Sequence, residues 1–121
     1  MLERIPDLPD DVVGVIATGE IAADDYDIVL VPAVEAAIGK HGHVRLVYQL
    51  GPGFSSFSAG AMWDDAKLGM THLGKWKKIA VVTDLAWVSG MIRALGFAIP
   101  CPARVFSNDA LAEAIAWVSI D

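Results

Sequence analysis

The residues that most often perform catalysis or bind metals are not grouped in a recognisable way in this 121-residue chain. His41 and His43 are separated by one residue, and a metal site built on them needs a third ligand that the sequence does not indicate. Asp64 and Asp65 are adjacent, so on a helix they point in different directions and form no obvious acid–base pair. We therefore interpret the histidines as loop residues and expect no metal site.

The single cysteine, Cys101, stands between two prolines, with no basic residue nearer than Arg104 to favour its thiolate. One cysteine excludes an internal disulfide framework and a cysteine-based zinc site. The chain also lacks the glycine-rich phosphate loops and the Gly-x-Ser-x-Gly nucleophile turn. We expect a protein that is not an enzyme and has no cofactor.

Aromatic and methionine side chains are the more informative residues. Helices are expected over residues 58–73 and 85–95, and both carry apolar residues off the stripe that would pack on a sheet. Our hypothesis is an apolar cleft between these two helices, lined or bordered by Phe54, Phe57, Trp63, Trp87, Met91 and Phe97. The alternatives are that these side chains fill the core or form a homodimer contact.

A second group combines lysines with a tryptophan. Lys75, Trp76, Lys77 and Lys78 are consecutive, and lysines beside a tryptophan are typical of a contact with an anionic membrane surface. The alternative is the solvated entry to a strand.

Composition limits the classes of partner. The chain has a net charge of −6 and a pI near 4.8, which argues against nucleic acid as a partner. The charge is uneven, since residues 1–40 hold nine acidic and two basic residues. Mean hydropathy is +0.48, which is high for a small domain and favours a surface that binds an apolar group or a second copy. With no signal-like N-terminal segment, we expect a cytoplasmic protein, with peripheral membrane contact as an alternative.

Hydrophobic patterning predicts the elements that position these residues. Strands are expected over residues 1–8, 12–17, 43–50, 77–83 and 103–106, with an edge position for the first because of its prolines. Helices are expected over residues 22–40, 58–73, 85–95 and 110–118, and Pro32 should kink the first of them or start a second helix. Gly51-Pro52-Gly53 should end the 43–50 strand. The order β-β-α-β-α-β-α-β-α predicts one α/β domain over residues 1–121, with a mixed, mostly parallel sheet of about five strands and four helices.

Within this pattern, several segments resemble the SpoIIAA-like family of small bacterial proteins, which have the STAS-domain fold. The most specific part is residues 60–87, which includes GAMWDDAK at 60–67, HL at 72–73, KKIAVVTD at 77–84 and Trp87. Asp25-Tyr26, Pro32, Phe106 and Ala116-Trp117 fit the same pattern. The resemblance implies a binding module of largely unassigned role, without enzymatic activity, and with similarity to lipid-carrying CRAL-TRIO domains.

The resemblance to anti-sigma factor antagonists also implies a regulatory serine where the second helix begins. Ser58 is the best positional match, with Ser55 and Ser56 as the other candidate phosphate acceptors. The neighbours Phe57 and Ala59 depart from the antagonist motif, which has an acidic residue there. The alternative is that Ser58 is only the N-cap of the helix.

These observations favour a non-enzymatic domain that binds an apolar ligand, a lipid or a membrane surface in the cleft. The alternative is a protein-interaction module of the anti-sigma antagonist type, switched by phosphorylation. The partners expected are an apolar small molecule or lipid, a regulatory protein, and a second copy in a homodimer.

Overall fold

The computed structural model describes residues 1–72, 74–95, 99 and 101–120, and of Asp65, Gly69, Met70 and Leu95 it describes only the backbone. One five-stranded sheet forms its centre, with the strands in the order β1-β2-β3-β4-β5. The strands are β1 (Leu2–Arg4), β2 (Val12–Ile21), β3 (Val44–Phe57), β4 (Trp76–Val82) and β5 (Ala103–Phe106). β1 pairs antiparallel with β2, and every later pair is parallel, which confirms the mixed, mostly parallel sheet.

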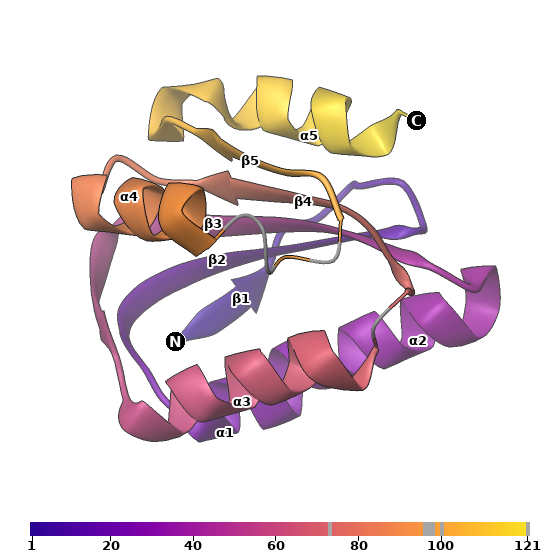
Figure 1. Cartoon of the computed structure of the whole chain (residues 1–121), viewed down its shortest axis with the longest axis horizontal. Coiled ribbons are helices and arrows are strands. Elements are labelled where there is room, and N and C mark those ends of the chain that lie inside the picture. Colours follow the sequence, from indigo (N-terminus) through magenta and orange to yellow (C-terminus); the bar gives the residue numbers. More distant parts are fainter. Residues whose placement is uncertain (73, 96–98, 100, 121) are drawn as a thin grey trace.

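The sequential strand order determines where the helices lie. Each parallel pair is joined by a helical crossover, and right-handed crossovers that all step in one direction place their helices on the same face of the sheet. The crossovers contain α1 (Ala23–Asp25), η1 (Tyr26–Leu30) and α2 (Val31–His41), then α3 (Ala59–Thr71), then α4 (Ala86–Leu95). The opposite face is covered by α5 (Leu111–Ser119), which follows the short 3-10 turn η3 (Asn108–Ala110) (Figure 1).

Two hydrophobic clusters reflect this arrangement. The larger cluster joins the sheet to the crossover helices, and its fully buried members include Val15, Tyr26 and Val34. The smaller cluster packs α5 on the other face, with Val47 and Val118 at 0% exposure. Successive residues of β2 and β3 point to opposite faces of the sheet, and helices cover both faces. Nearly every residue of the central parts of these strands is therefore buried, which explains their nearly continuous apolar sequences.

The first predicted helix is a composite. A π-helical turn at Tyr26–Leu30 comes directly before α2, and the Val31 N–H donates to the Tyr26 carbonyl, five residues back. Pro32 follows in the first turn of α2, directly after the π turn. Leu30 and Val31 both keep α-helical backbone dihedrals, so the chain passes from the π turn into α2 without a break, and the irregularity expected at Pro32 is a change in the hydrogen-bond pattern just before it.

The predicted end of the third strand is wrong. β3 does not stop at Gly51-Pro52-Gly53 but continues to Phe57, and β2 continues beside it to Ile21. Register shifts between Ala17 and Glu20 absorb the irregular backbone. Pro52 is tolerated because β4 pairs with β3 only as far as Gln49, so this stretch lies on an edge.

Candidate functional site

The start of α3 is built around Ser58. Its hydroxyl accepts a hydrogen bond from the Ala61 N–H at 3.0 Å, which makes Ser58 the N-cap of the helix. Ser55 and Ser56 are exposed and lie on β3, before the helix begins. Ser58 therefore has a structural role, and phosphorylation at the three serines stays a prediction.

The six side chains expected to line a cleft divide into two groups. Phe54 and Phe57 lie on β3 and not in a loop, half-buried, with their ring centroids 4.9 Å apart. Phe57 also packs near Tyr48, whose hydroxyl lies 3.0 Å from that of Tyr26. These rings extend the core from β3 towards η1.

The second group is exposed. Trp63 on α3 is 69% exposed, and on α4 Trp87 is 53% and Met91 39% exposed. The alternative that these tryptophans fill the core is therefore wrong. Phe97 lies outside the described residues.

An open hollow of about 310 Å³ lies beside Trp63, and its other lining residues are Ala66, Lys67 and Thr71. All four belong to α3. Among the residues that the structure describes, none of α4 lines this hollow, so their arrangement is a surface feature of α3 and does not form the expected cleft between two helices. Met62, at 59% exposure, adds a further apolar side chain to the same helix.

A pair of carboxyl groups lies next to this surface, and sequence reasoning missed it. Asp64 is 9% exposed, and while both carboxyls are ionised its Oδ2 atom is buried without a hydrogen-bond donor among the described residues. Its Oδ1 atom lies 4.0 Å from the Lys67 ammonium. A hydrogen bond shared with Asp64 raises the pKa of Asp27 on η1, because only the protonated Asp27 carboxyl can donate to Asp64. When neither carboxyl holds a proton, the pair concentrates negative charge beside the hollow.

Two exposed apolar residues flank this pair in the sequence. Ile28, which is 74% exposed, follows Asp27, and Trp63 precedes Asp64. We call the set of Met62, Trp63, Asp27 and Asp64, with the hollow, the α3 surface. It combines apolar side chains with two carboxyl groups and the ammonium of Lys67, which lines the hollow.

The expectation that Trp76 contacts a membrane is wrong. The Trp76 side chain is 8% exposed and belongs to the larger hydrophobic cluster. Lys78 donates a hydrogen bond to the Trp117 carbonyl at 3.0 Å, and its ammonium lies 4.6 Å from the Trp117 ring centroid. Lys75 and Lys77 are exposed, whereas the tryptophan between them in the sequence is buried.

The histidines lie where the sheet begins, and each contacts an aspartate. His43 Nε2 lies 2.8 Å from the Asp11 carboxylate, which also accepts a hydrogen bond from Arg45 at 2.9 Å. The hydrogen bond with His43, followed by that with Arg45, holds the pKa of Asp11 below its ordinary value. His41 lies 3.0 Å from Asp10. Within the described part of the chain, no cluster of three His, Cys, Asp or Glu side chains could hold a metal ion.

A hydrogen-bonded network at the opposite end of the sheet was not expected from the sequence. Asn108 accepts from Gln49 at 3.1 Å and donates to the Leu50 carbonyl at 3.1 Å and to Asp84 at 3.2 Å. The Asp84 carboxylate also accepts from the Asn108 backbone N–H, so it holds η3 in place. Each of the three side chains in this network has an internal partner, which gives the network a structural role.

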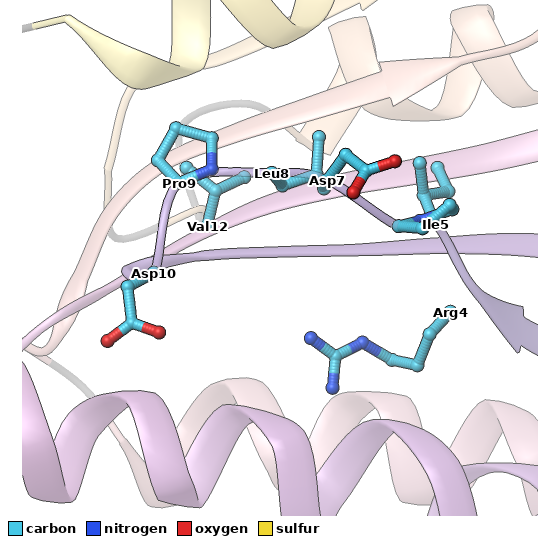
Figure 2. Close-up of a pocket in the computed structure, with 8 residues that line it drawn as sticks. Arg4, Ile5, Asp7, Leu8, Pro9, Asp10 and Val12 are labelled. Carbon is cyan, nitrogen blue, oxygen red and sulfur yellow. The ribbon is translucent and has the colours of Figure 1, made fainter.

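Two further features, Cys101 and a second hollow, lie apart from the α3 surface. Burial raises the pKa of the Cys101 thiol to about 11, which agrees with its expected inertness. A second hollow of about 270 Å³ lies within the connection between β1 and β2. Figure 2 shows the Arg4, Asp7 and Asp10 side chains at this hollow, together with Ile5 and Leu8. The lining of this hollow comes from one short connection. The α3 surface includes residues of both η1 and α3, so we take the α3 surface as the candidate site.

None of the helices described is both long and apolar enough to cross a membrane.

Comparison with known proteins agrees with this architecture. A crystal structure of an uncharacterized protein of the DUF3478 family with a SpoIIAA-like fold, from Shewanella loihica PV-4, superimposes with a TM-score of 0.75. The alignment covers 97% of this chain and 93% of the other at 21% identity, so it shows a shared fold. Comparison with functionally curated proteins returned no match. A family model described as SpoIIAA-like matches residues 12–119, and the chain therefore belongs to the SpoIIAA-like family.

Proposed function

We propose that this protein is a non-enzymatic binding domain that takes its partner on the α3 surface. The observation that carries the proposal is the exposed Trp63 beside an apolar hollow on the same helix. Tryptophan and methionine are enriched at the centres of protein interfaces, where they supply much of the binding free energy.

The open shape of the hollow favours an apolar group presented by a partner over a fully enclosed ligand. An enclosed site would surround most of a small ligand with protein walls. Here one helix supplies the lining, so an apolar side chain from another protein fits better than a free lipid.

The charge around Trp63 indicates the rest of the partner. Asp27 is exposed and lies against the buried Asp64. A lysine or arginine of the partner would pair with the Asp27 carboxylate and offset its negative charge. An anionic membrane would meet repulsion at the same position. The proposed partner is therefore a protein segment that presents an apolar side chain next to a basic one.

Two synthetic amphipathic peptides, with identical leucine positions and either lysine or glutamate elsewhere, test this proposal. Titration calorimetry should show tighter binding of the lysine peptide, and Trp63→Ser should weaken that binding at least tenfold. Trp87→Ser is the matched control, because it removes an exposed tryptophan from the other helix. Asp64→Asn should reduce the preference for lysine over glutamate while leaving some apolar binding.

Binding to lipid vesicles is the measurement that could contradict this proposal. Binding to phosphatidylcholine vesicles containing phosphatidylglycerol, without binding of either peptide, would overturn the proposal in favour of a membrane contact. Equal binding of the lysine peptide by the Trp63→Ser variant would overturn the assignment of the α3 surface.

A further inference from the structure

One position on the packed side of α3 carries a carboxyl group where the helix pattern favours an apolar side chain. Ala61, Asp64 and Leu68 follow one another at three- and four-residue spacing, and all three are buried. Ala61 and Leu68 belong to the larger hydrophobic cluster. Asp64 therefore occupies a packing position, and burial of an ionised carboxylate there costs free energy unless a donor or a cation compensates it.

The groups around Asp64 compensate this charge incompletely. Asp27 of η1 lies against it, and Asp24 of α1 adds a negative charge near Asp27. Asp25, also on α1, accepts a backbone hydrogen bond at the start of its own helix. The Lys67 ammonium lies 4.0 Å from Oδ1 of Asp64, and Oδ2 has no donor among the described residues while both carboxyls are ionised. A proton on one carboxyl removes this deficit, because the protonated group donates to the other.

We propose that a proton held between Asp27 and Asp64 competes with the basic group of the partner, so that acidification closes the α3 surface to a basic segment. This inference rests on the proposed function and adds its regulation. In the free protein, one carboxyl donates its O–H to the other. In the complex, the ammonium or guanidinium of the partner donates to the Asp27 carboxylate instead. The displaced proton passes to solvent, so one complex releases at most one proton from this pair.

The unequal burial of the two carboxyls suits this competition. Asp27 is exposed, so both water and a partner can reach it, whereas Oδ2 of Asp64 is buried. Trp63 precedes Asp64 in the sequence and borders the hollow, so the apolar contact of the same partner lies close to the proton. Asp27 is therefore the group that exchanges one positive neighbour for another, and Asp64 is the fixed group behind it.

The direction of the pH effect follows from the same contact. The hydrogen bond with Asp64 raises the pKa of Asp27 above its ordinary value of 3.8. As the pH rises through that raised pKa, the proton leaves and the pair gains a full negative charge. Binding of a basic segment should therefore strengthen from acidic to neutral pH, in a range where an ordinary aspartate is already ionised.

Calorimetric titration with the leucine–lysine peptide at about pH 7 and about pH 4.5 tests the competition. The peptide carries an amidated C-terminus, so it holds no carboxyl group that titrates between these values. The affinity of the wild-type chain should fall at least about threefold at the lower pH, because the shared proton must then be displaced. Asp64→Asn should bind more weakly at pH 7 but lose less than about 1.5-fold on acidification, because a carboxyl of ordinary pKa 3.8 stays largely ionised.

Asp24→Asn is the matched control, since it removes an exposed acidic group near the pair without removing either member. It should keep the wild-type fall in affinity. An equal fall in the wild-type chain and in Asp64→Asn, or no fall in the wild-type chain, would overturn the proposal.

Proton release gives a second readout of the same titrations. Repeating them in buffers of different ionisation heat counts the protons released on binding. At about pH 4.5, the wild-type chain should release at least about half a proton for each complex, and Asp64→Asn about a fifth or less. Release of no proton by the wild-type chain at this pH would overturn the competition.

The carboxyl carbon resonances of the free chain separate this inference from the proposed function. The pair should titrate in two steps, with the upper step above the ordinary range of an aspartate. Titration of both carboxyls near pH 3.8 would overturn the shared proton. Peptide binding that is equal at both pH values would overturn this inference alone. Absence of peptide binding at both pH values, with a raised titration of the pair, would overturn the proposed function and leave the shared proton in place.

Discussion

At the scale of single residues, Arg45 shows how a buried charge is accommodated. Its side chain is 6% exposed, and its guanidinium donates to Asp11 and to the carbonyls of Val118 and Ile120. It thereby ties the connection before β2 to the end of α5. A buried guanidinium with these partners is stable because its donors are paired.

We predict that Asp11→Asn lowers the free energy of unfolding at pH 7 by about 1.5–3 kcal/mol, because a charged hydrogen bond to a buried group is lost. The pKa of Asp11 is lowered in the folded state, so its contribution is full above the ordinary value of 3.8 and is lost as the pH falls through the lowered pKa. Urea unfolding at several pH values measures both effects.

The adjacent exposed residue provides the control for this prediction. Asp10→Asn should change the stability little, because Asp10 is solvated and its contacts with Lys40 and His41 are screened. An equal loss in both variants would show that the Arg45 contact is not the cause.

At the scale of elements, the connection between β1 and β2 packs over a glycine. The Ile5 and Leu8 side chains lie against Gly14, and a Cβ atom there would clash with Leu8. We predict that Gly14→Ala destabilises the protein by about 1 kcal/mol, because the end of the Leu8 side chain must rotate away and the Ile5 Cβ atom, 3.1 Å from the added atom, must shift slightly. Thermal unfolding measures the midpoints of this variant and of the control Gly39→Ala, which should be neutral or stabilising.

The elements also show what the sequence could predict. The strand predicted over residues 1–8 is shorter, Leu2–Arg4, because the turn-forming Pro6 and Pro9 follow it. Apolar periodicity nonetheless located every strand and helix. It failed at residues 51–57, because turn-type residues were interpreted locally while the pairing of β3 with β2 is a tertiary contact. It also failed at Trp76, since the lysines around it resemble a solvated segment whereas the indole points into the core.

The candidate site was predicted only in part, for a similar reason. Trp63 and Trp87 were identified because they lie off the packing stripes of their helices. The proximity of Asp27 and Asp64 could not be predicted, because it depends on how η1 packs beside α3, and the π turn shifts the register of that helix.

At the scale of the whole molecule, the two faces of the sheet are covered unequally. α5 is anchored by hydrogen bonds from Arg45 and Lys78 to its last carbonyls and has two fully buried side chains, Ala114 and Val118. α4 has one side chain below 9% exposure among those described, Val88.

We predict that the backbone amides of α4 exchange with solvent faster than those of α5, because segments with few buried contacts open at lower free energy. Hydrogen exchange followed by mass spectrometry measures this directly. Equal protection of both helices at low concentration would contradict the prediction.

The Asn108 network has a consequence for how the protein ages in storage. Asparagine side chains slowly lose ammonia and become aspartate. At Asn108 this change would remove the amide that donates to the Leu50 carbonyl and to Asp84, and would place a second carboxylate beside Asp84. The end of β3 would then lose its tie to η3, so one chemical lesion could loosen both faces of the sheet at once.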